Sequence, residues 1–515
     1  MEPTTTKPLA KIKPLLGLIV AILITVVGML SVYVAGNARG YDPSMTVLVR
    51  NVLLMCFFLV VYSLLKRNYK GDFTILVVVA FLTGIGFIVQ YRISAAINVG
   101  FQETLVKQYS AAIAKQDSVK EDSGEAVAPD TTAVGISEER KLETIRKEAE
   151  QLLKLEKLNF RQLLGQFFGS IPGWSRLIVS YLIALLSIVY LVKKCSSDKF
   201  MDSLAQPFFW VTLTIFLLFV FVALSEVKTR GRFVYQMTPW EAFKITIIIF
   251  LAGFFAKYKD EFTRNTPKIK GKRVKNLLIP WGPFVLIWLV PQLLFVLLKD
   301  FGQVILYGGL VIIMIFVLTR KYIYLFGGIA ITVVTSKVIL LLEGIAPPHV
   351  LQRFLIWSDI WAPPRNEAWW DNVYQIMNSF FALNAGGLTG SGLGLGYPTN
   401  IPLVVSDFVY SAISEELGFL GAVAIVMLYL LLFFLGIRVA LESENDFEKM
   451  LATGFTTILA LQVFVNIGGV VKLIPLTGIT LPFISRGGFS FLISTFIIGL
   501  LMGLSHRNGK RIFSV

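Results

Sequence analysis

Long apolar runs separated by short basic segments dominate the chain. One of them, "LIVAILITVVGMLSVYVA" (18–35), contains no charged residue. A helix of this length crosses the roughly 30 Å apolar core of a bilayer. The strands of a membrane β-barrel instead alternate in hydrophobicity over about ten residues. The pattern therefore predicts an all-α polytopic membrane protein.

Hydropathy averaged over windows of about 19 residues predicts twelve membrane-spanning helices. They lie near 14–35, 47–66, 74–91, 174–193, 206–226, 240–257, 277–297, 302–319, 322–342, 408–436, 448–470 and 478–504. The composition is also that of a membrane protein, because the 515 residues are 55% hydrophobic and only 16% charged, with a mean hydropathy of +0.70.

The basic residues predict which side each loop faces. Short loops reading "KRNYKGD", "KKCSSDK" and "HRNGKR" fall on one side, and residues 257–275 hold eight Lys or Arg against two acids. The positive-inside bias makes this side cytoplasmic, with both termini on it. The same bias explains the net charge of +15 without a nucleic-acid partner. The two cysteines, Cys56 and Cys195, have no metal or redox spacing and are interpreted as structural.

Two long hydrophilic segments, 92–173 and 343–407, then fall outside. The first combines a polar stretch of disordered composition with an amphipathic helix over 136–158. That helix is either a solvated spacer or a surface for a partner or for lipid. The second is dense in Trp, Gly and Pro, which is typical of a binding loop rather than a linker. Its run "GSGLGLG" lacks the context of a nucleotide-binding loop.

Three carboxylates stand out in "IPLVVSDFVYSAISEELGF" (401–419). Asp407 is placed at the outer start of a span, where it is either a helix-capping acid or a general base whose pKa is raised by partial desolvation. Glu415 and Glu416 lie deeper, where a carboxylate needs a cationic partner, so a structural ion pair is predicted.

Cations also gather near the outer ends of the spans. Cationic side chains neutralise phosphoryl oxygens, so they are candidates for binding a lipid diphosphate, although each could equally be a surface charge. They are Arg232, Lys244, Arg353, Lys472 and Arg486, with the acids Glu241 and Asp300 nearby.

Five segments resemble, in order, motifs of the SEDS family (shape, elongation, division, sporulation), which includes RodA and FtsW. They are "GRFVYQMTPWEAFK", "LKDFGQVIL", "YQIMNSFFALNAGGLTGSGLGLG", "IPLVVSDFVYSAISEELGFLGA" and "VFVNIGGVVKLIPLTGITLPFISRGGFSFL". The resemblance implies a ten-helix core within 71–515, preceded by a two-helix extension over 1–70. The outer insertion at 92–173 enlarges the family's first outer loop.

The resemblance further implies an inverting peptidoglycan glycosyltransferase that polymerises lipid II at the outer leaflet of the bacterial cytoplasmic membrane. The family's partner is a class B penicillin-binding transpeptidase. The family's essential aspartate falls on Asp407, and Glu241, Asp300, Glu415, Glu416 and Gln375 are given supporting roles.

The sequence departs from the family pattern at several motif positions. Leu403 and Val405 replace the glutamate and histidine of "PEAHTDF", Lys299 replaces the proline of "QPDLG", and Arg486 replaces the tyrosine of "SYGG". Lys299 and Arg486 add cations to a diphosphate site. The lost glutamate removes either a ligand for a divalent cation, such as magnesium or manganese, or a group that shifts the pKa of Asp407. Two other functions remain open, a flippase for lipid-linked precursors and a non-catalytic scaffold for a transpeptidase.

Overall fold

The structure is a computed structural model. It describes residues 13–39, 43–95, 173–207, 240–263, 300–341, 348–361, 367–486 and 488–512, together with isolated positions between 208 and 295. Three predicted features lie outside these residues: the amphipathic helix at 136–158, most of the spans at 206–226 and 277–297, and the side chains of Arg232 and Lys299.

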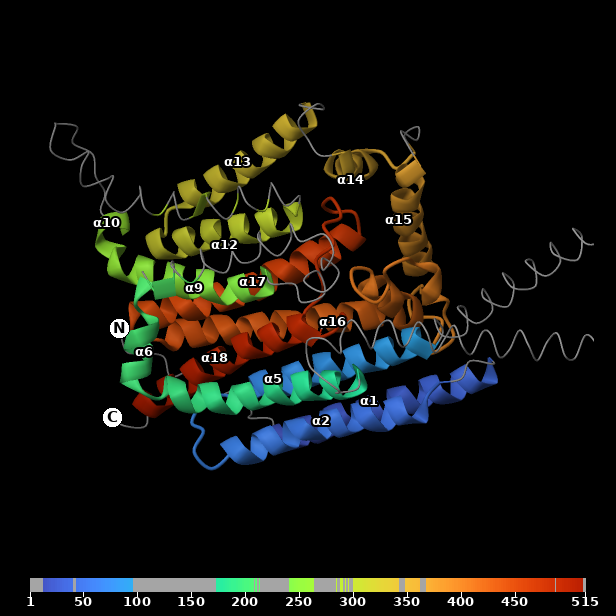
Figure 1. Ribbon diagram of the computed structural model, residues 1–515, viewed down its shortest axis with the longest axis horizontal. Helices are drawn as coiled ribbons and strands as arrows, with labels where there is room; N and C mark the ends of the chain where they lie inside the picture. Colours follow the sequence, from blue (N-terminus) through green and yellow to red (C-terminus); the bar gives the residue numbers. More distant parts are fainter. Residues whose placement is uncertain are drawn as a thin grey trace, which may run out of the picture.

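The described residues form helices and loops without a strand, as predicted (Figure 1). The helices are α1 (Pro14–Ala38), α2 (Met45–Leu65), an unlabelled helix Thr74–Ala95, α5 (Gly173–Cys195), α6 (Asp198–Leu204), α9 (Trp240–Lys257), α10 (Lys259–Thr263), α12 (Phe301–Thr319), α13 (Tyr322–Leu341), α14 (Pro348–Ser358), α15 (Glu367–Ala385), the 3₁₀ turn η1 (Pro398–Asn400), α16 (Val409–Glu442), α17 (Asp446–Val470) and α18 (Gly488–Ile512).

Eight of the described helices are long and apolar enough to cross a membrane, so the chain is a multi-pass membrane protein. They include α1, α2, the helix Thr74–Ala95, α5, most of α12, α16, α17 and α18. The total of twelve spans stays a prediction, because two of the predicted spans lie mostly outside the described residues.

Two predicted boundaries are wrong. The last span was placed at 478–504, but α18 begins at Gly488. Residues 478–486 form a loop in which Gly478 and Phe483 have positive φ, outside the right-handed helical region. The helix predicted at 408–436 extends to Glu442, and it bends at Gly418, where φ is 67°.

The two ends of the bundle have different structures. At one end, near α6 and α10 (Figure 1), Lys259 pairs with Asp446 at 2.7 Å and Arg511 pairs with Glu448 at 2.8 Å. At the other end lie α14 and α15, which occupy part of the predicted outer segment 343–407. The start of α16, and with it Asp407, lies at the end that carries α14 and α15.

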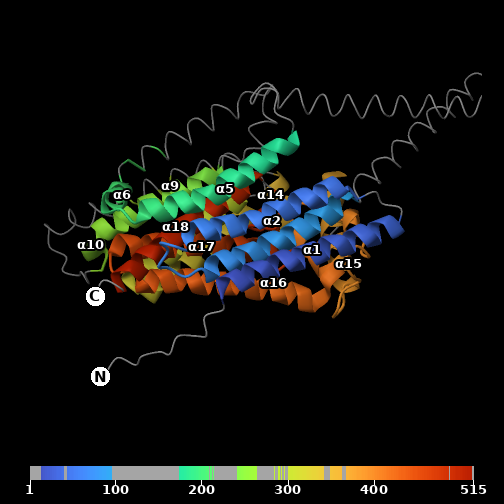
Figure 2. The same ribbon diagram turned by 90° about the horizontal axis from the view of Figure 1, so that it is seen from below.

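The core is centred on α17, which packs against α9, α12 and α16, while α18 packs along α5. Glycines bring α1 close to the helix Thr74–Ala95. A Cβ on Gly28 would lie 2.5 Å from Ile88, and one on Gly84 would lie 2.2 Å from the hydroxyl of Thr25. The N-terminal helices therefore lie along the flank of the bundle, as Figure 2 shows for the two blue helices α1 and α2.

Candidate active site

Asp407 lies in a short turned segment directly before α16. Leu403 begins this segment in the left-handed region, with φ at 57°. Its carbonyl accepts hydrogen bonds from the backbone N–H of Ser406 at 3.0 Å and from the Ser406 hydroxyl at 3.1 Å. A non-glycine residue with positive φ is uncommon, so the turn is held by its surroundings.

The loop 478–486 holds this turn from the side. The Ser485 hydroxyl donates to the carbonyl of Ser406 at 2.6 Å, and the N–H of Arg486 donates to the carbonyl of Val405 at 2.9 Å. Ser485 also accepts from the N–H of Leu481 at 2.8 Å. The backbone preceding Asp407 is thereby fixed to the loop that replaces the start of the predicted last span.

Asn466 of α17 joins the two segments at the position of the acid itself. Its side-chain nitrogen donates to the carbonyl of Asp407 at 2.9 Å and to that of Ile479 at 2.6 Å. Asn466 is 3% exposed, so both hydrogen bonds are shielded from water. The Asp407 backbone is held by a rigid helix rather than by the loop alone.

The carboxylate of Asp407 faces Gly478 and Arg353. A Cβ on Gly478 would lie 3.4 Å from Oδ2 of Asp407 and 3.9 Å from Nη2 of Arg353, and it would meet no other described atom within 4 Å. Gly478 itself is exposed, so the acid and the cation border on open space. Burial raises the pKa of Asp407, while a hydrogen bond from Ser406 and the charge of Arg353 lower it. The balance is a carboxyl with a raised pKa beside a guanidinium.

Arg353 is positioned by contacts between α14 and the loop after α17. Its Nη1 donates to the carbonyl of Thr477 at 3.3 Å, and the indole N–H of Trp357 donates to the carbonyl of Lys472 at 3.1 Å. Lys472 is half-buried and has φ at 61°. Helix α14 therefore carries the candidate Arg353 and also contacts the backbone of the candidate Lys472 through Trp357.

A second polar cluster lies on α9 and at the start of α12. Lys244 forms a buried ion pair with Glu241 at 2.7 Å and donates to Gln462 of α17 at 3.0 Å. Gln462 in turn donates to the carbonyl of Thr480 at 3.0 Å, in the loop beside Asp407. Lys244 is 1% exposed, so this arrangement does not present it to a ligand, and its predicted contact with substrate stays a prediction.

Asp300 connects the two clusters. It caps α12 by accepting from the N–H of Gln303 at 3.3 Å, and burial raises its pKa against the opposing charges of Arg353 and Lys244. Arg353 therefore acts on both Asp300 and Asp407. Three acids, Glu241, Asp300 and Asp407, share this end of the bundle with Lys244 and Arg353, and Arg353 borders on open space.

Glu415 and Glu416 face away from this cluster. Glu416 forms an ion pair with Arg92 at 2.9 Å and accepts from the N–H of Gly394 at 3.2 Å. Glu415 accepts from the N–H of Tyr397 at 2.6 Å. Both acids thus hold the "GSGLGLG" segment against α16, which is a structural task.

Two further candidates do not join Asp407. Arg486 is exposed, and its charge acts on Arg50 of α2. Gln375 is half-buried on α15, and its side chain has no hydrogen bond to a described residue. Arg92, Gln462, Asn466 and Gly478 were not among the predicted site residues, although the last three lie in or beside the quoted "VNIGG" and "LTGITLPFIS" motifs.

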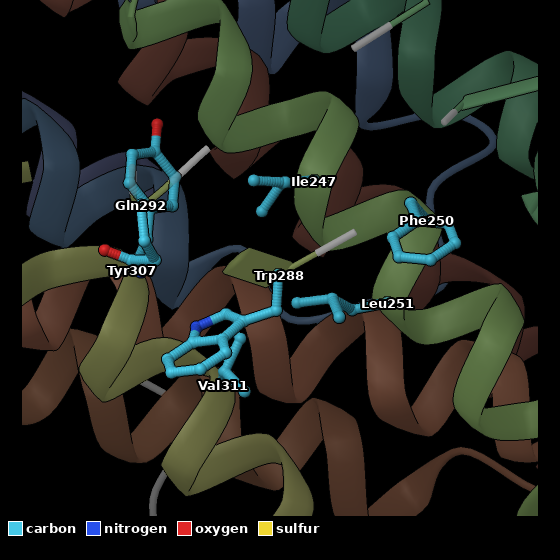
Figure 3. Close-up of a pocket in the computed structure, with 7 residues that line it drawn as sticks. All are labelled: Ile247, Phe250, Leu251, Trp288, Gln292, Tyr307 and Val311. Carbon is cyan, nitrogen blue, oxygen red and sulfur yellow. The ribbon is translucent and has the colours of Figure 1, made fainter. Parts of the chain in front are cut away.

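A small cavity is lined by residues of α9 and α12 together with Trp288 and Gln292 (Figure 3). Its volume is about 10 Å³, close to what one water molecule needs. The side-chain amide of Gln292 and the indole N–H of Trp288 lie there without a partner among the described residues. The cavity fits a buried water and is too small for a lipid chain.

Metal ligands do not gather in the described part of the chain. No group of three or more His, Cys, Asp or Glu residues there is arranged to hold a metal ion. The predicted divalent cation stays a prediction, and among the described residues the charge of Arg353 acts on Asp407.

Fold and site together define a polytopic helical membrane protein that holds a partly buried carboxyl and a guanidinium at one end of its spans. The family model for FtsW, RodA and SpoVE, described as a cell cycle protein, matches residues 162–510. The chain belongs to this family.

Individual relatives carry more specific names. The chain is 31% identical over 276 residues to "Peptidoglycan glycosyltransferase RodA" of Mycobacterium tuberculosis, which covers 53% of this chain and 56% of the relative. It is 32% identical over 277 residues to "Probable peptidoglycan glycosyltransferase FtsW" of Geobacter metallireducens, covering 53% and 68%. The chain thus spans little more than half the length of the first of these relatives.

A solved structure is also similar. It is titled "Structural coordination of polymerization and crosslinking by a peptidoglycan synthase complex" and matches with 23% identity over 65% of this chain and 89% of that chain. Its TM-score of 0.48 is too low to support an argument, so the assignment to the family rests on the sequence matches.

Proposed function

We propose that this protein is a glycosyltransferase that polymerises lipid II into glycan strands at the outer face of the bacterial cytoplasmic membrane. One observation carries the proposal. Asp407, at the position of the family's essential aspartate, borders on open space together with Arg353. The names of the relatives, peptidoglycan glycosyltransferase, support the same reaction.

Asp407 acts as the general base. It takes the proton from a hydroxyl of the acceptor sugar while that oxygen forms a bond to the anomeric carbon of the donor. The bond between this carbon and the diphosphate oxygen breaks, and the electron pair leaves with the prenyl diphosphate. A raised pKa makes the carboxylate a stronger base for this transfer. A single base suffices for a reaction that inverts the anomeric centre.

Arg353 stabilises the leaving diphosphate. Its guanidinium lies beside the same glycine as the carboxylate, and positive charge near the breaking bond lowers the barrier where negative charge develops. Lys244, Glu241 and Asp300 support this position from inside the bundle. No step is assigned to a metal ion.

The orientation of the chain in the membrane follows from the distribution of its basic residues. The end opposite Asp407 carries Lys193 and Lys194 in the last turn of α5, Lys257 in that of α9, and Lys510 in that of α18. The positive-inside bias makes that end cytoplasmic, with both termini there, and Asp407 external. We also propose a class B penicillin-binding transpeptidase as partner, as the resemblance to the SEDS family implies.

The activity is tested with purified protein in liposomes that contain fluorescent lipid II and the transpeptidase. We expect glycan strands that a muramidase digests. Movement of labelled lipid between the leaflets without strands would indicate a flippase instead. The absence of both, with an intact complex, would indicate a scaffold.

A further inference from the structure

Two arginines at the outer end of the bundle, Arg50 and Arg486, have no acidic partner among the described residues. Arg92, at the same end, forms an ion pair with Glu416. The guanidinium of Arg50 donates from Nε and Nη2 to the side-chain oxygen of Asn51, at 3.2 and 3.1 Å. That amide is neutral, so it orients the guanidinium without compensating its charge.

Packing of the surrounding helices brings α2 and the loop 478–486 together. Neighbouring residues of the helix Thr74–Ala95 contact both: Gln90 donates to the carbonyl of Ile484 at 3.3 Å, and Tyr91 donates to that of Ser44, directly before α2, at 3.3 Å. Tyr181 of α5 acts electrostatically on Arg50, and its ring packs at a tilt against Phe491, 4.0 Å between centroids. The charged or titratable groups that act on Arg50 are Tyr181 and Arg486.

Neither Arg50 nor Arg486 is among the groups that act on the Asp407 carboxyl. The backbone of Arg486 is bonded to Val405, yet the groups that act on the Asp407 carboxyl are Ser406 and Arg353. Arg486 therefore does not belong to the site described above. In the SEDS pattern its position holds a tyrosine, and Arg50 lies in the predicted two-helix extension.

Like charges at a membrane boundary repel strongly, because the low dielectric of protein and lipid weakens screening. Arg50 is five residues into α2, about 8 Å along the helix from its outer start. Its half-buried stem reaches the level of lipid headgroups there. A phosphate between the two guanidiniums would replace their repulsion with charge-assisted hydrogen bonds.

We propose that Arg50 and Arg486 form a binding site for the phosphate group of a membrane lipid, at the junction between the N-terminal helix pair and the core. The phosphate belongs either to a bilayer phospholipid or to a prenyl diphosphate. The site is separate from the proposed catalytic acid and holds whether or not the chain polymerises lipid II.

The test is native mass spectrometry of the purified full chain with three added lipids: phosphatidylglycerol, undecaprenyl diphosphate and a diacylglycerol that lacks phosphate. We expect Arg50→Gln and Arg486→Gln each to weaken binding of a phosphate-bearing lipid at least tenfold. The double variant should lose little more than either single variant, because both residues contact one group. Arg438→Gln, at the opposite end, is the matched control and should bind as wild type does.

The lipid that shows the loss identifies the source of the phosphate. Equal binding by wild type and both variants, or equal binding of the diacylglycerol, would overturn the proposal. Thermal unfolding gives a second measurement if Arg50→Gln folds poorly. The phosphate-bearing lipid should raise the melting temperature of wild type and of Asp407→Asn, but not that of Arg486→Gln, and a rise in all three would also overturn it.

Discussion

Gly478 lies beside both the proposed base and its cation, so Gly478→Ala tests the geometry of the site. The new methyl group would lie 3.4 Å from Oδ2 of Asp407 and 3.9 Å from Nη2 of Arg353. It would occupy space from which a sugar hydroxyl or water reaches the carboxylate. A hydrogen bond to a charged group contributes about 1.5–3 kcal/mol. Loss of the hydrogen bond between the sugar hydroxyl and the carboxylate should lower the polymerisation rate by about ten- to a hundredfold.

The backbone supplies a second effect, which must be separated from the first. Gly478 has φ at +79°, and an alanine there costs about 1–2 kcal/mol of stability. Gly387, with φ at +51° and no described atom within 4 Å of an added Cβ, is the matched control. Gly387→Ala should lose similar stability in a thermal unfolding assay and keep its rate of strand synthesis.

Initial rates of glycan synthesis from fluorescent lipid II distinguish the two variants. If Gly478→Ala and Gly387→Ala are equally active, the space beside Gly478 is not used by substrate. The placement of the reaction between Asp407 and Arg353 would then be wrong.

Three further predictions concern the charges and contacts around the site. Glu416→Gln leaves the buried charge of Arg92 without its carboxylate, so it should lower the free energy of unfolding by about 3–5 kcal/mol. Thermal unfolding measures this, and a decrease below about 1 kcal/mol would contradict the prediction. Arg353→Gln removes a charge that lowers the pKa of Asp407, so the acidic limb of the rate–pH profile should move to higher pH; movement to lower pH would refute the assignment. Asn466→Leu removes the side chain that donates to two carbonyls, so it should lower the free energy of unfolding by about 1–3 kcal/mol. It should also reduce the rate of strand synthesis more than a substitution far from the site that lowers stability equally.

Most helices were predictable because an apolar run of about 20 residues has few alternatives in a membrane. The loop 478–486 was not, because its apolar residues resemble the start of a span. Ile479, Leu481 and Ile484 are buried in the core although the backbone is not helical. Hydropathy reports burial, and it does not distinguish a buried loop from a helix.

The acid of the site was predictable and its contacts were not. Asp407 lies in a motif that the sequence shows, and Arg353 was one of several candidate cations. The partner of Glu416 is Arg92, 324 residues away in the chain, and no local pattern indicates which of many arginines packs there. Asn466 acts by bonding backbone carbonyls and Gly478 by leaving space beside the acid, and neither role leaves a pattern of charge or hydrophobicity in the sequence.

The role of Asp407 as base is tested most directly by Asp407→Asn, which keeps the shape of the side chain and removes its ability to accept a proton. Asp359→Asn, an equal change at an exposed acid that ends α14, is the control. With lipid II and the transpeptidase in liposomes, we predict full strand synthesis by Asp359→Asn and none detectable by Asp407→Asn, with both variants folded. Strand synthesis by Asp407→Asn at the wild-type rate would contradict the account.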